Sequence, residues 1–172
     1  MATRGDMVAA ISAYMAARKR ILGYDSAPSW APGFTAHEVV MKYPLEVGGE
    51  ISGQLWVVGF PRSQALKFRL SVVLHGPACR LDYTDETHAN SINGFDSGLV
   101  PMEVSGPHYH SWPINQRFFR GATKPPELHD AVPYTEPGRT FDAVLRWFCT
   151  DTNIDSLPGS HLIGLPAPGL LL

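Results

Sequence analysis

The sequence predicts a single α+β domain, in which a mostly antiparallel sheet is flanked by an N-terminal and a C-terminal helix. Residues 36–112 contain short runs rich in β-branched and aromatic residues, separated by Gly, Pro or Ser turns. Apolar residues recur at helical spacing before and after this region. A chain of 172 residues, 44% of them hydrophobic, is long enough to bury one core. We therefore expect one domain over residues 1–172, with about five or six strands.

The first helix is predicted within residues 1–23. One helical face is formed by apolar residues at the i, i+3, i+4, i+7 spacing, namely Met7, Val8, Ile11, Tyr14 and Met15. Asp6 has the short polar side chain typical of an N-cap, and Gly23 is typical of a helix end. We therefore expect an amphipathic helix that packs against the sheet.

Three strand-like runs follow at residues 37–45, 49–60 and 66–76, which favours an antiparallel meander. Because strand side chains alternate between faces, the third run places apolar residues on one face and Lys67 and Arg69 on the other. The next run continues the polar face through Arg80 and Asp82. Residues 99–104 and 107–112 are predicted to return to the sheet as short strands, and Pro101 indicates that the first is an edge strand.

The C-terminal third is predicted to contain one helix between two irregular segments. Residues 121–139 carry four prolines and are typical of a long surface loop. Thr140 is a good N-cap for a helix over residues 140–150, in which apolar residues again follow the helical spacing. The tail, residues 151–172, is apolar but interrupted by Pro and Gly, so we expect it to pack in extended form against the body.

Composition excludes several classes of protein. The formal net charge of -2 gives no overall basic field that would attract nucleic acid, although a local patch remains compatible with it. Cys79 and Cys149 lie far apart, which disfavours a structural zinc site or a disulfide framework and favours two buried thiols. No signal-peptide pattern or apolar run of ~18 residues occurs, so we expect a cytoplasmic protein that does not bind membranes. The motifs GxSxG, GxxxxGK[ST] and GxGxxG are absent.

The segment SGPHYHSW, residues 105–112, contains the strongest candidate for a functional site. His108 and His110 occupy positions i and i+2, so on a strand both imidazoles point to one face, with Cβ atoms about 7 Å apart. Trp112 would continue this face as a wall or a stacking surface. The alternative is that the two histidines are solvated side chains of an ordinary strand.

Residues 80–90 concentrate further polar groups just before the chain returns to this pair. If His88 meets His108 and His110, three imidazoles together with Asp85 or Asp82 form a site for zinc or another divalent metal. This prediction depends on contact between residues 80–90 and 105–112, which the sequence by itself does not establish.

A second hypothesis uses the same groups without a metal. One histidine acts as general base and another as general acid, Arg80 stabilises an anionic oxygen, and Asp82 orients an imidazole. This combination suits phosphodiester cleavage, and RNA is the easier substrate because its 2′-hydroxyl can serve as the nucleophile. The groups expected to bind the substrate are cations that steer phosphate and aromatic rings that stack on bases, namely Lys67, Arg69, Arg117, Trp112, Phe118 and Phe119. Charged strand residues are more often simply solvated, however, and phenylalanines more often belong to a core.

The residues Arg-Leu-Asp (80–82), His88 with Asn90, Gly-Pro-His-Tyr-His (106–110) and Phe-Cys (148–149) resemble the pattern of a family of small uncharacterised bacterial proteins. The resemblance covers mainly residues 65–158. The turn of that family reads His-x-Asn-Pro, whereas this chain has Ser91 in place of the proline. The resemblance implies that the histidine pair belongs to a shared site, but it implies no particular activity.

Two functional hypotheses follow from the sequence. The first is a small cytoplasmic hydrolase, either a phosphodiesterase or a ribonuclease, of the kind found in bacterial toxin or defence modules, with His88, His108, His110, Arg80 and Asp82 at its centre. The second is a protein-binding module without enzymatic activity, in which Trp112, Phe118 and Phe119 anchor a protein partner.

Overall fold

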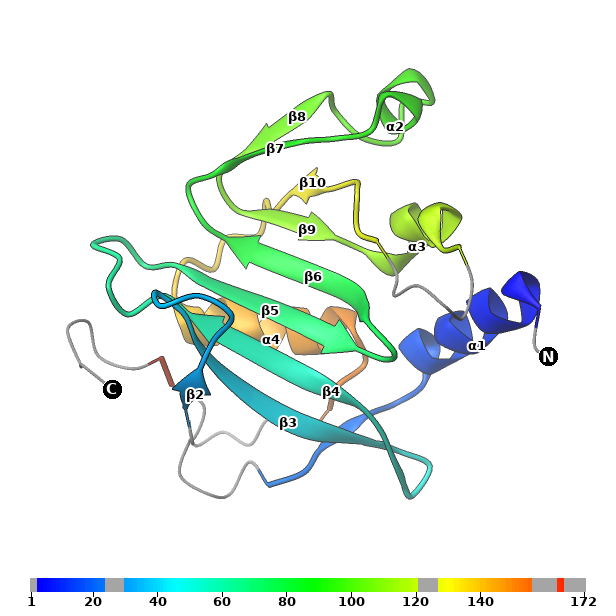
Figure 1. The fold of residues 1–172 in the computed structure, drawn as a ribbon, viewed down its shortest axis with the longest axis horizontal. Helices are drawn as coiled ribbons and strands as arrows, with labels where there is room; N and C mark the ends of the chain where they lie inside the picture. Colours follow the sequence, from blue (N-terminus) through cyan, green and yellow to red (C-terminus); the bar gives the residue numbers. More distant parts are fainter. Residues whose placement is uncertain (1–2, 24–29, 121–126, 156–163, 166–172) are drawn as a thin grey trace.

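The computed structural model describes residues 3–23, 30–120, 127–155 and 164–165. Within these ranges the chain forms a mostly antiparallel sheet with helices at both ends, which confirms the predicted α+β class (Figure 1). The sheet has eight strands rather than five or six. The additional strands are only two residues long, so they leave no alternating pattern in the sequence.

The strand order of this sheet is β1-β3-β4-β5-β6-β9-β10, and β2 pairs with β3. The strands are β1 (Arg20–Ile21), β2 (Ala31–Pro32), β3 (Val39–Val47), β4 (Glu50–Gly59), β5 (Phe68–Val73), β6 (Pro77–Tyr83), β9 (His108–His110) and β10 (Val132–Pro133). All of these pairs are antiparallel. The meander β3 to β6 matches the predicted runs, whereas β10 lies inside the segment that we expected to be a loop.

A separate two-stranded sheet, β7 (Thr87–Ala89) with β8 (Glu103–Ser105), connects β6 to β9. Between its strands the chain forms the short helix α2 (Ile92–Asp96), and Figure 1 shows this hairpin beyond β9 and β10. Residues 99–104 were predicted to return to the main sheet, but β8 pairs with β7 instead. Residues 90–102, between β7 and β8, therefore form the tip of a separate hairpin.

One face of the main sheet carries the apolar core. Phe68, Leu70 and Val72 of β5 are fully buried, and helix α4 (Phe141–Asp151), which lies behind the sheet in Figure 1, packs in the same core through Val144 and Phe148. Burial of each such side chain contributes about 1.5–3 kcal/mol to folding. Because side chains alternate along each strand, the same pairing directs the intervening polar residues to the opposite face.

The predicted C-terminal helix and its N-cap are confirmed. The hydroxyl of Thr140 accepts a hydrogen bond from the amide of Ala143 at 3.3 Å, so Thr140 caps helix α4. Cys79 and Cys149 are buried in the core as free thiols, and burial raises the pKa of each to about 12. Most of the predicted extended tail, residues 151–172, lies outside the described residues. Among those described, no helix is long and apolar enough to cross a membrane.

The N-terminal helix α1 (Arg4–Ala16) begins and ends differently from the prediction. Thr3 is its N-cap, and Asp6 occupies the third helical position of a capping box, in which each side chain accepts from the other residue's backbone amide. The helix ends at Ala16 rather than near Gly23. The following residues instead form β1, because Arg20 and Ile21 pair with strand β3.

Lys19 joins the two terminal helices. Its side chain is fully buried, and its ammonium donates to the carbonyls of Met15, Ala17 and Thr152 at 2.8–2.9 Å. Burial lowers the pKa of this ammonium to about 8, so the group remains charged at neutral pH. The carbonyls at the ends of α1 and α4 thereby gain a donor that the helices themselves do not supply.

Replacing Lys19 with Met should lower the free energy of unfolding by about 3 kcal/mol, because three carbonyls lose their shared donor. The matched control is Arg18→Met, since Arg18 lies next to it but its side chain is 84% exposed. Urea denaturation of both variants measures the difference. Equal stability of the two variants would contradict this role of Lys19.

Candidate functional site

The pairing of β6 with β9 brings together the two segments that the sequence left unconnected. Arg80 lies opposite His110, and Asp82 lies opposite His108, in an antiparallel register. All four side chains therefore share the polar face of the sheet. The contact between residues 80–90 and residues 105–112, on which the site hypothesis depends, is present in the structure.

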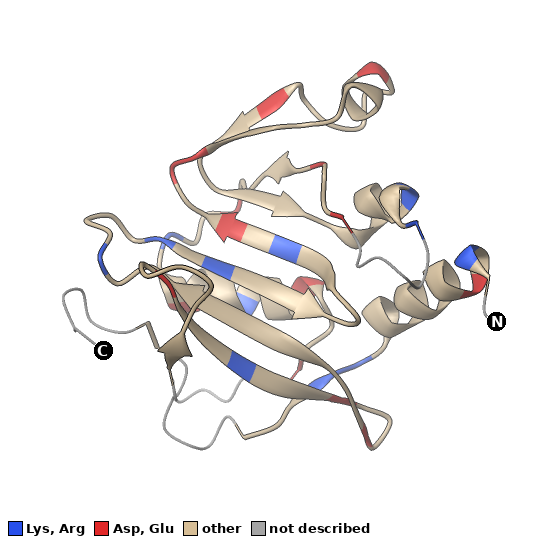
Figure 2. Cartoon of the chain, viewed as in Figure 1, with Lys and Arg blue, Asp and Glu red and all other residues tan. Residues whose placement is uncertain are grey.

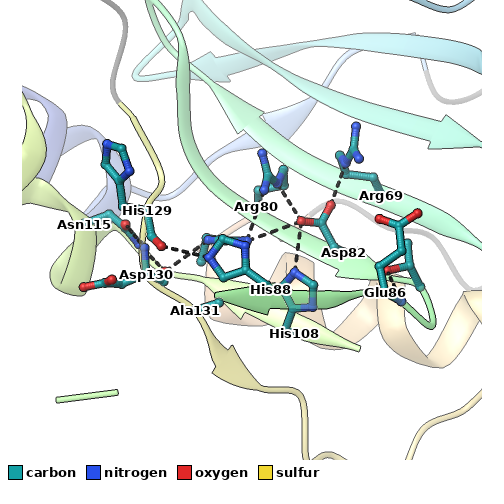
Figure 3. Close-up of polar contacts among 12 residues, drawn as sticks. Arg69, Arg80, Asp82, Glu86, His88, His108, Asn115, His129, Asp130 and Ala131 are labelled. Atoms are coloured by element: carbon teal, nitrogen blue, oxygen red, sulfur yellow. Dashed lines mark hydrogen bonds and ion pairs between the residues drawn. The ribbon is translucent and has the colours of Figure 1, made fainter. Parts of the chain in front are cut away.

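His88 completes a cluster of three imidazoles. It lies on β7, and Figure 3 shows it beside His108. Its ring centroid is 5.3 Å from that of His108 and 4.6 Å from that of His110. One ring nitrogen of each histidine lies within 4.8 Å of one from each of the others. His108 and His110 are buried, whereas His88 is half-buried and lies over them at the edge of the site. The condition for the predicted metal site, that His88 meets His108 and His110, is therefore met in the structure.

Asp82 is the buried anion at the centre of the site. Its Oδ1 accepts from Nε of Arg69 at 2.5 Å, and its Oδ2 accepts from Nε of Arg80 at 2.8 Å. The same Oδ2 lies 3.4 Å from Nε2 of His108 and 3.3 Å from Nε2 of His110. Burial opposes ionisation, but these imidazoles and guanidinium charges outweigh it and hold the pKa of Asp82 well below its usual range.

The two buried histidines differ in their affinity for a proton. Burial lowers the pKa of His110 to about 4, against the opposing effect of Asp82. His108 is also affected by burial, but its hydrogen bonds to Asp82 and to the carbonyl of Gly106 prevail and raise its pKa above the usual value. At neutral pH His110 is therefore the neutral member of the pair, and His108 retains its proton to a higher pH than an ordinary histidine.

Each imidazole also donates to a backbone carbonyl. Nδ1 of His108 donates to Gly106 at 2.7 Å, Nδ1 of His110 to Asp130 at 3.1 Å, and Nε2 of His88 to His129 at 2.8 Å. Gly106 adopts a φ of 79°, a left-handed conformation that glycine readily accepts, and thereby turns the chain into β9. Two of the three carbonyls belong to residues 129–130, within the region predicted to be a surface loop.

Two asparagines hold that segment in place. Asn115 accepts from the amide of Asp130 at 2.9 Å and donates to its carbonyl at 2.8 Å, while Asn90 makes the same two contacts with Ala131 at 2.7 and 2.9 Å. The sequence pattern included Asn90 but missed Asn115 and Asp130. No periodicity marks these residues, because their role depends on contacts between distant segments.

The expectation that Trp112 extends the histidine face is wrong. Strand β9 ends at His110, and Trp112 begins the short helix α3 (Trp112–Asn115), which is favoured by Pro113 in its first turn. The indole is 3% exposed, packs with Ile11 and Phe119, and donates to the hydroxyl of Ser12. Neither Trp112 nor Phe119 is therefore available to stack on a base or to anchor a partner.

The remaining predicted residues lie around the cluster rather than in it. Asp85 is exposed and pairs with Lys67, so it is not a member of the histidine cluster; Asp82 lies there instead. Arg117 pairs with the fully buried carboxylate of Asp130 and therefore has a structural partner. Arg69 alone of the predicted substrate-binding cations touches the central carboxylate.

A small cavity of about 280 Å³ lies on the same face of the sheet. Lys67 and Thr84 line it. Lys67 lies two residues before Arg69 of β5, and Thr84 lies two residues after Asp82 of β6, so all four side chains point to the same face. Phe60 and Arg62 contribute an aromatic ring and a second cation to its wall. In Figure 2 basic segments mark the neighbouring strands β5 and β6, with an acidic segment near the end of β6.

No family model, curated protein or solved structure matches the chain. The resemblance to a family of small bacterial proteins therefore stays a prediction.

Replacing Asp82 with Asn should lower the pKa of His108, because burial and the charge of Arg80 would then act without the opposing carboxylate. The same change should lower the free energy of unfolding by about 3 kcal/mol, since the half-buried guanidinium of Arg80 loses its counterion and that of Arg69 keeps only Glu38 at 3.8 Å. Titration of the imidazole protons by NMR measures the pKa. Asp85→Asn, an exposed acid-to-amide change, is the control and should leave it unchanged.

Proposed function

We propose that this protein is a cytoplasmic hydrolase that cleaves phosphodiester bonds, with RNA as the substrate class, of the kind found in bacterial toxin or defence modules. One observation carries the proposal. Two imidazoles and two guanidiniums converge on a single buried carboxylate, and a third imidazole packs against the first two, on the polar face of a sheet whose other face is the core. Imidazoles supply proton transfer near neutral pH, and guanidiniums are suited to bind phosphate oxygens.

RNA cleavage requires a base, an acid and a stabiliser of charge. The base removes the proton of the 2′-hydroxyl, the 2′-oxygen attacks phosphorus, and the bond from phosphorus to the 5′-oxygen breaks. The acid returns a proton to that 5′-oxygen, so the products are a cyclic phosphate and a free hydroxyl. Two imidazoles of the cluster suit the roles of base and acid, Arg80 suits the role of binding the charged phosphate oxygens, and Asp82 orients His108 and His110.

The exposure of the side chains supports an approach of substrate along the strands. The side chains of Arg69 and Arg80 are 31% and 28% exposed, so a phosphate would meet the guanidiniums before the buried histidines. His88 is half-buried and is the accessible imidazole of the cluster. The cavity beside Lys67 gives room for a neighbouring nucleotide on the same face.

Incubation with a labelled oligoribonucleotide and with the DNA of the same sequence tests this proposal. The wild type should cleave only the RNA and leave a 2′,3′-cyclic phosphate, and His88→Gln should reduce the rate by about 10²–10⁴-fold, as typical for loss of a proton-transfer group. His75→Gln is the matched control, because His75 is exposed at the turn between β5 and β6. An inactive wild type, or equal cleavage by His88→Gln, would contradict the proposal.

A second candidate function is protein binding, because the hairpin between β7 and β8 exposes a group of large apolar side chains. These are Ile92, Phe95, Leu99 and Met102, which are 44–77% exposed. They replace the buried Trp112 and Phe119 as the residues that would anchor a partner. The double variant Ile92→Ser, Met102→Ser separates the two functions. A hydrolase should cleave RNA both as the wild type and as this variant, whereas a binding module should cleave it as neither.

A further inference from the structure

The geometry points to a transition-metal site formed by His88, His108 and His110, with Zn²⁺ as the ion that its chemistry fits best. The inference rests on the same residues as the proposed function and specifies how that centre would work. It can nevertheless stand alone, because metal binding is measured without a substrate.

Backbone contacts fix which nitrogen of each imidazole carries the proton. A carbonyl oxygen only accepts hydrogen bonds, so the ring nitrogen that contacts Gly106, Asp130 or His129 must carry the proton. In the neutral imidazole the other nitrogen then carries the lone pair. These are Nε2 of His108, Nε2 of His110 and Nδ1 of His88. Backbone carbonyls behind metal-binding histidines fix the tautomer in this way.

The three rings also converge on one another and on Asp82. The three rings place ligand nitrogens within 4.8 Å of one another, and Oδ2 of Asp82 lies 3.3–3.4 Å from two of them. Nε2 of His108 donates to this carboxylate, so a bound ion would displace that proton, and the buried carboxylate requires positive charge beside it in either case.

Arg80 supplies part of that positive charge. It donates from Nε to Asp82 and from Nη2 to Nε2 of His110, at 2.8 and 3.1 Å. Among the described residues, the guanidinium of Arg80 makes no hydrogen bond to His88 or to His108. Its side chain is 28% exposed, so the Nη2 group can withdraw toward solvent while Nε stays on Asp82. A metal ion, unlike the guanidinium, would satisfy all three imidazoles at once.

The donor set indicates which ion would bind. Imidazole nitrogens suit Zn²⁺ and related transition metals, whereas Mg²⁺ and Ca²⁺ prefer sites made of oxygen ligands. Three protein ligands with a further position for water are typical of catalytic zinc. A water bound in that position would ionise near neutral pH and replace an imidazole as the base.

Isothermal titration of the chelator-treated protein with Zn²⁺, alongside the visible spectrum of the Co²⁺-loaded form, tests the site. We expect one ion per chain and the intense absorption of tetrahedral Co²⁺, with no heat from Mg²⁺. The half-buried His88 is the residue of choice for substitution, because His88→Gln should fold. It should weaken Zn²⁺ binding by at least ~100-fold, beyond the 10–100-fold loss typical of residues that only orient a ligand.

The matched control is His129→Ala. This change removes an exposed imidazole beside the cluster but keeps the backbone carbonyl that His88 contacts. It should bind Zn²⁺ as the wild type does. No Zn²⁺ binding by the wild type, or equal binding by His88→Gln, would overturn the inference. RNA cleavage by chelator-treated protein would refute a catalytic role of the metal but keep the hydrolase, and Zn²⁺ binding without cleavage would refute the hydrolase but keep the metal site.

Discussion

The buried carboxylate of Asp82 is the interaction on which the polar face of this protein depends. An unpaired charge at 4% exposure is strongly destabilising, so the surrounding structure must compensate it. Arg69 from β5 and Arg80 from β6 do so through their Nε groups, and the two imidazoles of β9 contact the same carboxylate from the other side. One side chain therefore joins three adjacent strands and brings the histidines within reach of the guanidiniums.

The second requirement is a rigid support behind the imidazoles. Residues 129–131 run beside β9 and present two carbonyls to His88 and His110, while the amides of Asn90 and Asn115 hold the backbone of this segment. Arg117 pairs with Asp130 and fixes it further. The orientation of each ring is thus determined by backbone atoms, which tolerate less movement than side chains. Such support is what both proton transfer and metal binding require.

The core explains why the site lies where it does. Helix α4 covers one face of the sheet, so the alternating residues of β5, β6 and β9 must point to the other. That face is only partly open, because the β7–β8 hairpin brings His88 over the histidine pair. The hairpin therefore has two features of functional interest, the third imidazole at its base and the exposed apolar residues at its tip.

The sequence by itself determined the α+β class, the meander, the C-terminal helix and the alternation that places His108 and His110 on one face. These features follow from local periodicity, which the sequence displays directly. The alternation also placed Arg80 and Asp82 on the polar face, with His88 close by in the sequence. Asp85 was offered beside Asp82 as a metal ligand, however, and the strand was extended two residues too far, to Trp112. Only the tertiary structure decided these points, because the register of β6 against β9 and the contacts of residues 129–131 join segments 20 to 41 residues apart. Such pairings depend on how the whole sheet closes, and no local pattern records them.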